Sequence, residues 1–322
     1  SKFEIKSDKA HKELQKICTS NIKNEVGKCI YTHMLNPDGG IETDLTVVCI
    51  EKDHFRIISS AATRERDKFH INKHLTKDVE LKDVTDDYCV FGVFGPKSRA
   101  LMKSISKDNF ENDNFRFSTA KYITIEGIKI WTQRLSYVGE LGYELYVKSK
   151  DAKKIYELLI DKGKDFNLSN CGMHAMDIMR MESGFLHWGH DISPEENQYQ
   201  AGLSFTISSK KEDEFIGKKA LEKIKKEKIK SRFAMFTLKD SKPGEPLLLH
   251  DEPIYLENKI IGRSTSGNYS FNFKKNLAFG YINNDISNNE LHKKDLFIEV
   301  EKKKYPIEII IKPLKQTNFK NN

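Results

Sequence analysis

Hydrophobic and polar positions along the first sixty residues predict a small mixed sheet. Residues 1–6 alternate as in a strand, and apolar side chains then recur at helical spacing over residues 10–18. Two apolar runs, 29–35 and 45–50, flank the sequence Asn-Pro-Asp-Gly-Gly, which is a strong turn signal. This pattern predicts a hairpin, and residues 55–59 predict another short strand beside it.

The middle of the chain alternates between strand and helix patterns. Pro96 is expected at the start of a helix, and Gly163 is expected to end another. The expected elements are a helix from 63 toward 75, a strand over 91–95, a hairpin of 122–125 with 128–131, a strand over 142–147, and helices over 151–163 and 173–182.

From about Ser231 the pattern changes to short strand-like runs separated by Gly, Pro and Asn turns, which indicates a separate all-β lobe. The runs are 233–238, 259–262, 277–282, 296–300 and 305–311. We therefore expect a first region over 1–230, a β-barrel domain over 231–316 and a tail over 317–322, with the polar end frayed from Lys315 onward.

Composition narrows the function classes. The formal net charge of +7 comes mainly from scattered lysines rather than from arginines and aromatics gathered on one element, which disfavours nucleic-acid binding. No apolar run has the roughly 20 residues of a membrane-spanning helix. Five cysteines without a CxxC pair favour a reducing compartment, expected to be the cytoplasm, or the mitochondrial matrix in a eukaryote. Because residue 1 already lies in a strand pattern, we expect a fragment of a longer chain.

The predicted hairpin carries the first candidate site. Its adjacent glycines, Gly39 and Gly40, permit a sharp turn and the close approach of a flat ligand. On the returning strand, Asp44 precedes an apolar run, so its carboxylate must be hydrogen-bonded, face a pocket or face water. Asp44 is a candidate for stabilising positive charge or moving a proton, and a turn-capping role is the alternative.

Two further segments carry candidate polar groups. Strand alternation places Tyr143 on the core face and Glu144 on the opposite face, where one carboxylate could accept two N–H groups of a flat heterocycle. Arg180 could bind a carboxylate or pair with Asp177 on the same helix. The sequence His-Trp-Gly-His-Asp over 187–191 has no common metal-site spacing, so loop hydrogen bonding is favoured and no metal is expected.

At these places the sequence resembles the glycine-cleavage T-protein (aminomethyltransferase) family. The landmarks, in the family's order, are 31–45, 61–67, 94–96, 136–144, 180–184, 215–221 and 262–267. The amino-acid sequence over 137–146 and 187–192 is similar to the C-terminal folate-binding half of dimethylglycine and sarcosine dehydrogenase-like proteins. In those proteins an N-terminal flavin-binding half oxidises an N-methyl amine, and tetrahydrofolate in the C-terminal half accepts the one-carbon unit as methylenetetrahydrofolate.

The resemblance implies an α+β fold of T-protein type, with a central folate cleft and a small C-terminal β-barrel. It implies that Asp44 is catalytic, stabilising a cationic iminium and assisting proton transfer. It also implies cofactor-binding roles: Tyr31 would line the pocket, Tyr137 would pack on the pterin, Glu144 would hold its 2-amino and ring N–H groups, Arg180 would face the glutamate end, and Lys315, where the family has an arginine, would bind the folate tail.

The first functional hypothesis is the tetrahydrofolate-dependent part of a larger demethylating enzyme acting on a dimethylglycine-like or sarcosine-like amine. Its partner would be a flavin-binding domain or subunit, and FAD would be held only there, because this chain has no GxGxxG fingerprint. The alternatives are a free-standing aminomethyltransferase or sulfonium-type folate-dependent demethylase, and a non-catalytic regulatory relative.

Overall fold

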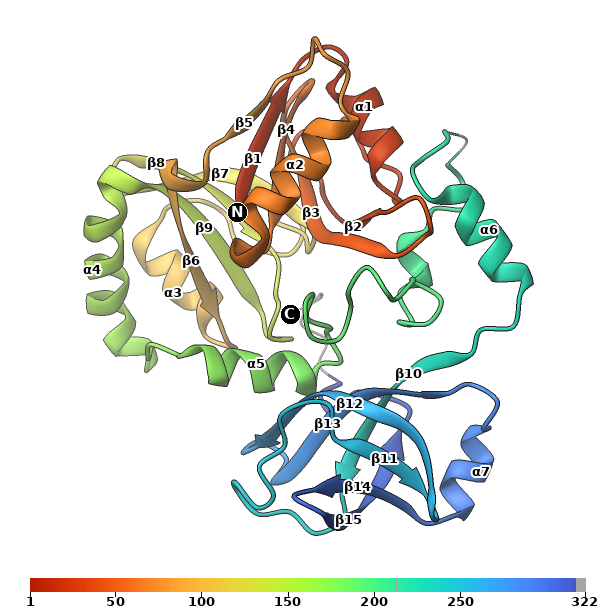
Figure 1. Ribbon diagram of the computed structural model, residues 1–322. Helices are drawn as coiled ribbons and strands as arrows, with labels where there is room; N and C mark the ends of the chain where they lie inside the picture. Colours follow the sequence, from red (N-terminus) through yellow and green to blue (C-terminus); the bar gives the residue numbers. More distant parts are fainter. Residues whose placement is uncertain (212, 317–322) are drawn as a thin grey trace.

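A computed structural model describes residues 1–211 and 213–316, so the expected tail over 317–322 lies outside the described residues. Within that part of the chain, the backbone forms a five-stranded sheet, a four-stranded sheet and a closed six-stranded barrel. The two sheets lie side by side and the barrel lies beneath them (Figure 1). This arrangement confirms the expected α+β fold with a C-terminal β-barrel.

The first sheet has the strand order β2-β3-β4-β1-β5. Its apolar face packs against α1, because alternate residues such as Leu45, Val47 and Cys49 all point to that side and are buried. The elements are β1 Lys2–Lys6, α1 Ala10–Ile17, β2 Cys29–Leu35, β3 Ile41–Glu51, β4 His54–Ser59, α2 Arg64–His74 and β5 Leu81–Asp83. The hairpin is confirmed, although β3 begins before the predicted residue 45, and β5 was not predicted.

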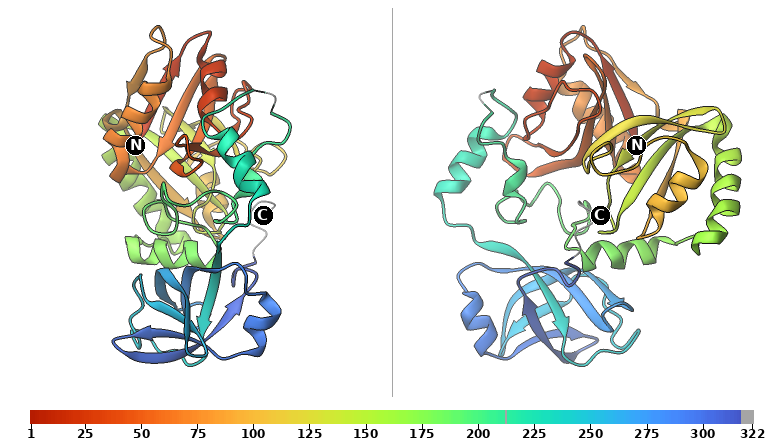
Figure 2. Two further views of the ribbon diagram at one scale, coloured as in Figure 1. Left: turned by 45° about the vertical axis from the view of Figure 1, so that its right-hand side comes forward. Right: turned by 180° about the vertical axis from the view of Figure 1, so that it is seen from behind.

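The second sheet has the order β6-β9-β8-β7 and is covered on its outer face by two helices (Figures 1 and 2). Its elements are β6 Tyr88–Phe94, α3 Ser98–Ile105, β7 Thr119–Ile125, β8 Ile128–Arg134, β9 Gly142–Lys148 and α4 Ala152–Gly163. Helix α4 ends at Gly163 as predicted, and a short 3-10 turn then leads to Asn167, which has the left-handed conformation with φ 59°. Gly163 has φ −64° and instead lets Leu168 approach closely.

The chain then crosses the middle of the molecule and enters the barrel, whose order is β10-β13-β12-β11-β14-β15 (Figure 1). The elements are α5 Met173–Glu182, α6 Lys218–Lys226, β10 Ser231–Leu238, β11 Pro253–Leu256, β12 Lys259–Ser270, β13 Lys275–Asn283, α7 Asn288–Lys293, β14 Leu296–Val300 and β15 Lys303–Ile310. The short 3-10 helices are η1 Ala61–Thr63, η2 Thr85–Asp87, η3 Ser149–Asp151, η4 Lys164–Phe166 and η5 Ser204–Thr206. Strand β11 and the second half of β12 were not predicted.

The state of the cysteines and the character of the helices can be compared with what the composition suggests. All five cysteines are free thiols, and Cys49 is buried in the core as its apolar run suggests. In the described residues, no helix combines the length and the apolar character needed to cross a membrane.

Candidate functional site

The inner faces of the two sheets meet along β2. Strand alternation puts Cys29, Tyr31 and His33 on one face of β2, and the Cys29 thiol points to Gln133 of β8 with Sγ 3.8 Å from Oε1. Gln133 pairs across the ladder with Glu144 of β9. The two sheets therefore present Tyr31 and Glu144 to the same inner region, and Tyr31 lies two residues, about 7 Å, along β2 from the Cys29 that contacts Gln133.

Asp44 joins Tyr31 on this inner face. It lies opposite His33 in the β2–β3 register, and the Tyr31 hydroxyl donates to its Oδ2 at 2.9 Å. Burial raises the pKa of Asp44 to about 6, the hydrogen bond from Tyr31 opposes that rise, and the charge of Asp67 adds to it. A carboxyl group with this pKa can hold or release a proton near neutral pH.

The glycines of the hairpin have a different role from the predicted one. Gly39 has φ +89° and its neighbours are side chains of α6, while a Cβ atom on Gly40 would lie 1.8 Å from the carbonyl oxygen of Pro194. The close approach at the hairpin tip is therefore made by protein. The interpretation that these glycines admit a flat ligand is not supported at this position.

Glu144 lies on the inner face of β9 as alternation predicts, while Tyr143 is buried in the opposite core. Burial raises the pKa of Glu144, and the hydrogen bond from Tyr146, 3.0 Å from Oε2, opposes the rise. Among the described residues Tyr146 is its only side-chain hydrogen-bond partner. Next to it, the fully buried Gln133 has an Nε2 group without a partner in the described structure.

Tyr137 belongs to the loop that precedes β9. Its hydroxyl donates to the Leu186 carbonyl at 3.1 Å, and its ring stacks on Phe185 with centroids 6.4 Å apart. Burial raises the pKa of Tyr137, the charge of Arg180 opposes this, and the charge of Asp44 adds to it. The charge of Tyr137 likewise raises the pKa of Tyr31, so Tyr137 is coupled electrostatically to the Asp44–Tyr31 pair.

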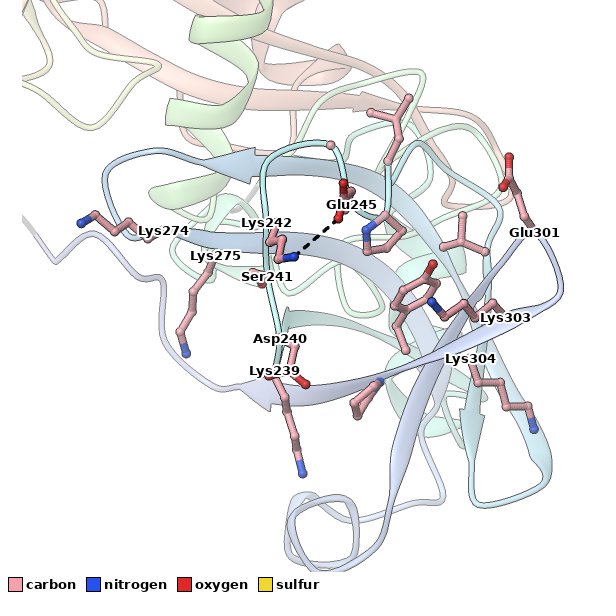
Figure 3. A pocket seen from close by; sticks show the side chains of 16 residues that line it. Lys239, Asp240, Ser241, Lys242, Glu245, Lys274, Lys275, Glu301, Lys303 and Lys304 are labelled. Carbon is pink, nitrogen blue, oxygen red and sulfur yellow. Dashed lines mark ion pairs between the residues drawn. The ribbon is translucent and has the colours of Figure 1, made fainter.

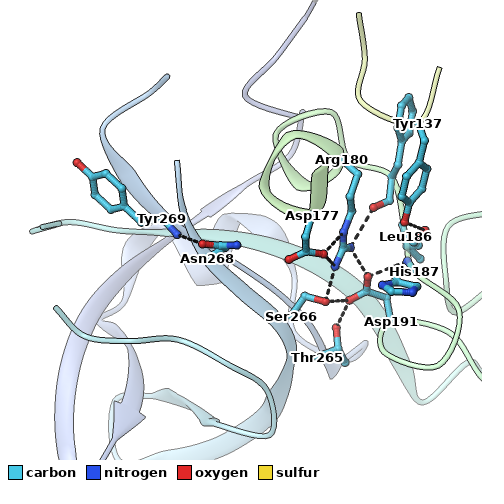
Figure 4. Close-up of polar contacts among 11 residues, drawn as sticks. Tyr137, Asp177, Arg180, Leu186, His187, Asp191, Thr265, Ser266, Asn268 and Tyr269 are labelled. Carbon is cyan, nitrogen blue, oxygen red and sulfur yellow. Dashed lines mark hydrogen bonds and ion pairs between the residues drawn. The ribbon is translucent and has the colours of Figure 1, made fainter. Parts of the chain in front are cut away.

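Arg180 is at the centre of a buried polar network that joins α5, the following loop and the barrel (Figure 4). Its Nε donates to Asp177 at 2.9 Å, and one terminal nitrogen donates to Asp191 and to the Phe185 carbonyl. The other terminal nitrogen donates to Ser266 at 2.8 Å and lies 2.8 Å from Asp177. These contacts use all five N–H groups, so a ligand carboxylate would have to replace one of them.

Lys315 holds the loop that carries Tyr137. Its Nζ pairs with Glu140 and donates to the Val138 carbonyl at 3.4 Å, while its backbone N–H donates to the Glu182 carbonyl at 2.8 Å. The expectation that the chain frays from Lys315 onward is therefore wrong at that residue. Whether Lys315 also contacts a ligand stays a prediction.

Comparison with known protein families identifies the chain. Residues 1–211 match the GCVT N-terminal domain, and residues 232–315 match the glycine cleavage T-protein C-terminal barrel domain. The chain belongs to the glycine cleavage T-protein family.

Two curated relatives and one solved structure illustrate the range of this T-protein family. Mitochondrial dimethylglycine dehydrogenase of Rattus norvegicus is 32% identical over 317 residues, covering 97% of this chain and 36% of the relative. An aminomethyltransferase of Halothermothrix orenii is 32% identical over 278 residues, covering 86% of this chain and 76% of the relative. The crystal structure of glycine cleavage system aminomethyltransferase T from Bartonella henselae superposes with a TM-score of 0.85 at 20% identity, covering 98% and 84% of the two chains, and shares the fold.

Within this T-protein fold, the structure adds polar residues that the sequence analysis did not single out. Asp67 of α2 accepts hydrogen bonds from Thr43 and Thr63 at 2.7 Å each, which ties the hairpin to α2 close to Asp44. His33 and Thr206 lie behind Tyr31, and both are buried. Asp67 falls inside a family landmark and could have been found there. Thr206 lies 173 positions from His33, so no local pattern connects them.

The barrel of this T-protein-family chain has a separate hollow of about 940 Å³ (Figure 3). Its lining residues come from 239–247, 274–275 and 300–306, so it contains none of the six predicted site residues. The lysines around it are Lys239, Lys242, Lys274, Lys275, Lys303 and Lys304, interspersed with Asp240, Glu245 and Glu301. Such a mixed surface fits the interpretation of the lysines as solvated charges.

Proposed function

We propose that this chain binds tetrahydrofolate between its two sheets and uses it to accept a one-carbon unit from an N-methyl amine. The observation that carries the proposal is a pair of acids on the two sheets: Asp44, which is hydrogen-bonded to Tyr31 of β2, and Glu144, whose strand partner Gln133 is contacted by Cys29, also of β2. Burial raises the pKa of both carboxyl groups, which is typical of residues that act on a ligand rather than on water.

The residues around Glu144 fit a pterin. One carboxylate with a single hydrogen-bond partner can accept two neighbouring N–H groups, and the unpartnered Nε2 of Gln133 can donate to a ring nitrogen or oxygen beside them. Tyr137 supplies an aromatic face already stacked on Phe185. An orphaned buried donor next to a buried acid is costly in the absence of a partner, and a polar heterocycle would satisfy both groups.

Asp44 supplies the acid–base group. Bound tetrahydrofolate contributes nucleophilic nitrogens for one-carbon units. Asp44 would stabilise positive charge developing beside it, and with a pKa of about 6, raised by burial, it would take up or release one proton at Oδ2. Arg180 and Lys315 would act at the glutamate end of the ligand through the network and the loop that they hold.

The relatives support a choice of donor and partner. The chain spans just over a third of the length of the dimethylglycine dehydrogenases that it matches. We infer that the amine is oxidised on a flavin-binding domain or subunit and that this chain forms the folate-dependent part of that demethylating enzyme. The match to three quarters of an aminomethyltransferase favours the free-standing transferase as the second candidate.

Calorimetric titration with tetrahydrofolate tests the proposal. Wild-type protein should bind in the micromolar range, and Glu144→Ala should weaken binding by about 2–4 kcal/mol, since a buried double contact is lost. Glu157→Ala, the same change on the outer face of α4, is the matched control and should leave the affinity unchanged. Wild-type affinity no tighter than millimolar would rule out folate, and equal affinities of wild type and Glu144→Ala would show that Glu144 does not contact the ligand.

A further inference from the structure

A continuous line of hydrogen bonds leads from Asp44 into the protein interior. Asp44 Oδ2 is 2.9 Å from the Tyr31 hydroxyl, which is 3.2 Å from His33 Nε2. On the far side of the ring, His33 Nδ1 is 2.9 Å from the Thr206 hydroxyl, which donates to the Leu203 carbonyl at 2.7 Å. His33 is 0% exposed and Thr206 is 2% exposed, so both side chains lie away from bulk solvent.

The number of protons fixes the direction of these bonds at the inner end. The Thr206 hydroxyl has one proton, and its shortest contact is the Leu203 carbonyl, which can only accept. Gln198 Nε2 lies 3.1 Å from the Thr19 hydroxyl, 3.3 Å from the Thr206 hydroxyl and 3.4 Å from His33 Nδ1, and its two protons serve the two shorter contacts. The bond between His33 and Thr206 therefore has Nδ1–H as its donor, which leaves Nε2 as a proton acceptor facing Tyr31.

The Tyr31 hydroxyl then has one proton and two acceptors. When Asp44 is ionised, Tyr31 donates to the carboxylate, and Nε2 of His33 has no donor. When Asp44 takes up a proton, its own O–H can donate to the Tyr31 oxygen, and the Tyr31 proton rotates to His33 Nε2. The protonated state therefore contains one hydrogen bond more than the ionised state, with no proton leaving the line.

We propose that Tyr31, His33 and Thr206 form a hydrogen-bond relay that stabilises the protonated form of Asp44 and so adapts it to proton transfer. His33 and Thr206 are positioning residues in this proposal, because they act on Asp44 through Tyr31 and touch no ligand. The proposed function is needed only to explain what the proton of Asp44 is used for, namely proton transfer to or from a bound ligand. The arrangement itself is a property of the ligand-free chain.

Other titratable groups around Asp44 do not reproduce this effect. Burial lowers the pKa of His33 to about 3, so the ring stays neutral and titrates outside the range of Asp44. Asp67 on α2 acts on Asp44 through its charge alone, and Tyr137 lies across the site and shares no hydrogen bond with Asp44. The Tyr31–His33 bond is therefore the contact whose presence depends on the proton of Asp44.

The test is the pKa of Asp44 in the ligand-free full chain, measured by NMR titration of carbon-13-labelled aspartate, with the Asp44 signal assigned by its loss in Asp44→Asn. Tyr31→Phe removes the bond to the ionised form and both bonds of the protonated form, so it disconnects His33 from Asp44 and should make the pKa of Asp44 insensitive to changes at His33. His33→Leu removes the acceptor that serves the protonated form and should lower the pKa of Asp44 by about 0.5–1 unit. A shift by His33→Leu that disappears when Tyr31→Phe is also present is not expected of two structural side chains.

Position 206 gives a second and milder pair of variants. Thr206→Val deprives Nδ1–H of its acceptor and favours the other tautomer, so the pKa of Asp44 should again fall, whereas Thr206→Ser keeps the hydroxyl and should leave it unchanged. An unchanged or raised pKa in both His33→Leu and Thr206→Val would overturn the relay. If His33→Leu does not fold, the Thr206 pair decides alone. Binding of tetrahydrofolate to the wild type is measured in a separate titration. A failure of the relay proposal can therefore be distinguished from a failure of the folate proposal.

Discussion

Asp44 shows how a single buried carboxyl group reduces the stability of the fold that holds it. Burial raises the pKa of its carboxyl group to about 6, above the ordinary value of 3.8. The folded protein therefore binds this proton more tightly than the unfolded chain does. The stabilisation associated with Asp44 is complete below pH 4 and is lost as the pH rises through 6, because the folded state must then hold a poorly solvated negative charge.

Removing the charge should accordingly stabilise the protein near neutral pH. Asp44→Asn keeps an acceptor for Tyr31 but does not titrate, so at pH 7 it should exceed wild type by about 1–3 kcal/mol. The gain should shrink toward zero at pH 4. Thermal unfolding of both proteins between pH 4 and pH 8 measures this, with Asp38→Asn at the exposed hairpin tip as the control. A difference that does not vary with pH would show that Asp44 is not held in a costly ionised state.

At the scale of elements, the hairpin depends on the absence of a side chain at Gly40. A Cβ atom there would lie 1.8 Å from the Pro194 carbonyl oxygen, and backbone cannot yield as a side-chain end can. Gly40→Ala should thus cost about 2–4 kcal/mol by forcing the hairpin away from the segment around Pro194. Gly39→Ala meets only α6 side chains and should cost about 1 kcal/mol through its φ of +89°. Urea unfolding compares the two, and equal costs would contradict this account.

Most elements were predictable because their patterns are local. Alternation was enough to place Glu144 on the inner face of β9 and Tyr143 in the core, and apolar runs located both hairpins. Short elements without a clear pattern were missed, namely the three-residue β5, which pairs with the distant β1, and the four-residue β11, which pairs with the adjacent β12 and with β14. Gly163 ends α4 as predicted, but the left-handed conformation typical of a terminating glycine is adopted by Asn167, while Gly163 serves the close packing of Leu168.

The candidate site was predictable only in part, for the same reason. Asp44 and Glu144 interrupt apolar or aromatic patterns, so each could be singled out locally. His33 lies in a strand with no distinguishing pattern, and its partner Thr206 comes from a short 3-10 helix far along the chain. Contacts between segments far apart in the sequence, including the hydrogen bonds of Arg180, are determined by the tertiary fold. They leave no periodic pattern in the sequence.

At the scale of the whole molecule, the Arg180 network is the main polar connection between the sheets and the barrel. Asp191 accepts from Arg180 on one side and from Thr265 and Ser266 of β12 on the other, and it is almost completely buried. Glu182 at the end of α5 similarly accepts from Ser270 at 2.6 Å. A buried ion pair with all its hydrogen bonds made contributes little net stability when intact, but breaking it leaves an uncompensated charge.

Weakening this connection should separate the unfolding of the barrel from that of the sheets. Both tryptophans, Trp131 and Trp188, lie outside the barrel, so fluorescence follows the sheet region while far-ultraviolet circular dichroism follows the whole chain. In wild type the two urea transitions should coincide. In Asp191→Asn the overall stability should fall by about 3 kcal/mol and the transitions should diverge, because Arg180 keeps its buried charge without a full counterion.

Glu157→Gln is the control, because it removes one member of an exposed pair with Lys153 on α4. It should change the stability by no more than about 0.5 kcal/mol and leave the two transitions coincident. Coincident transitions in Asp191→Asn would mean that apolar contacts alone couple the barrel to the sheets.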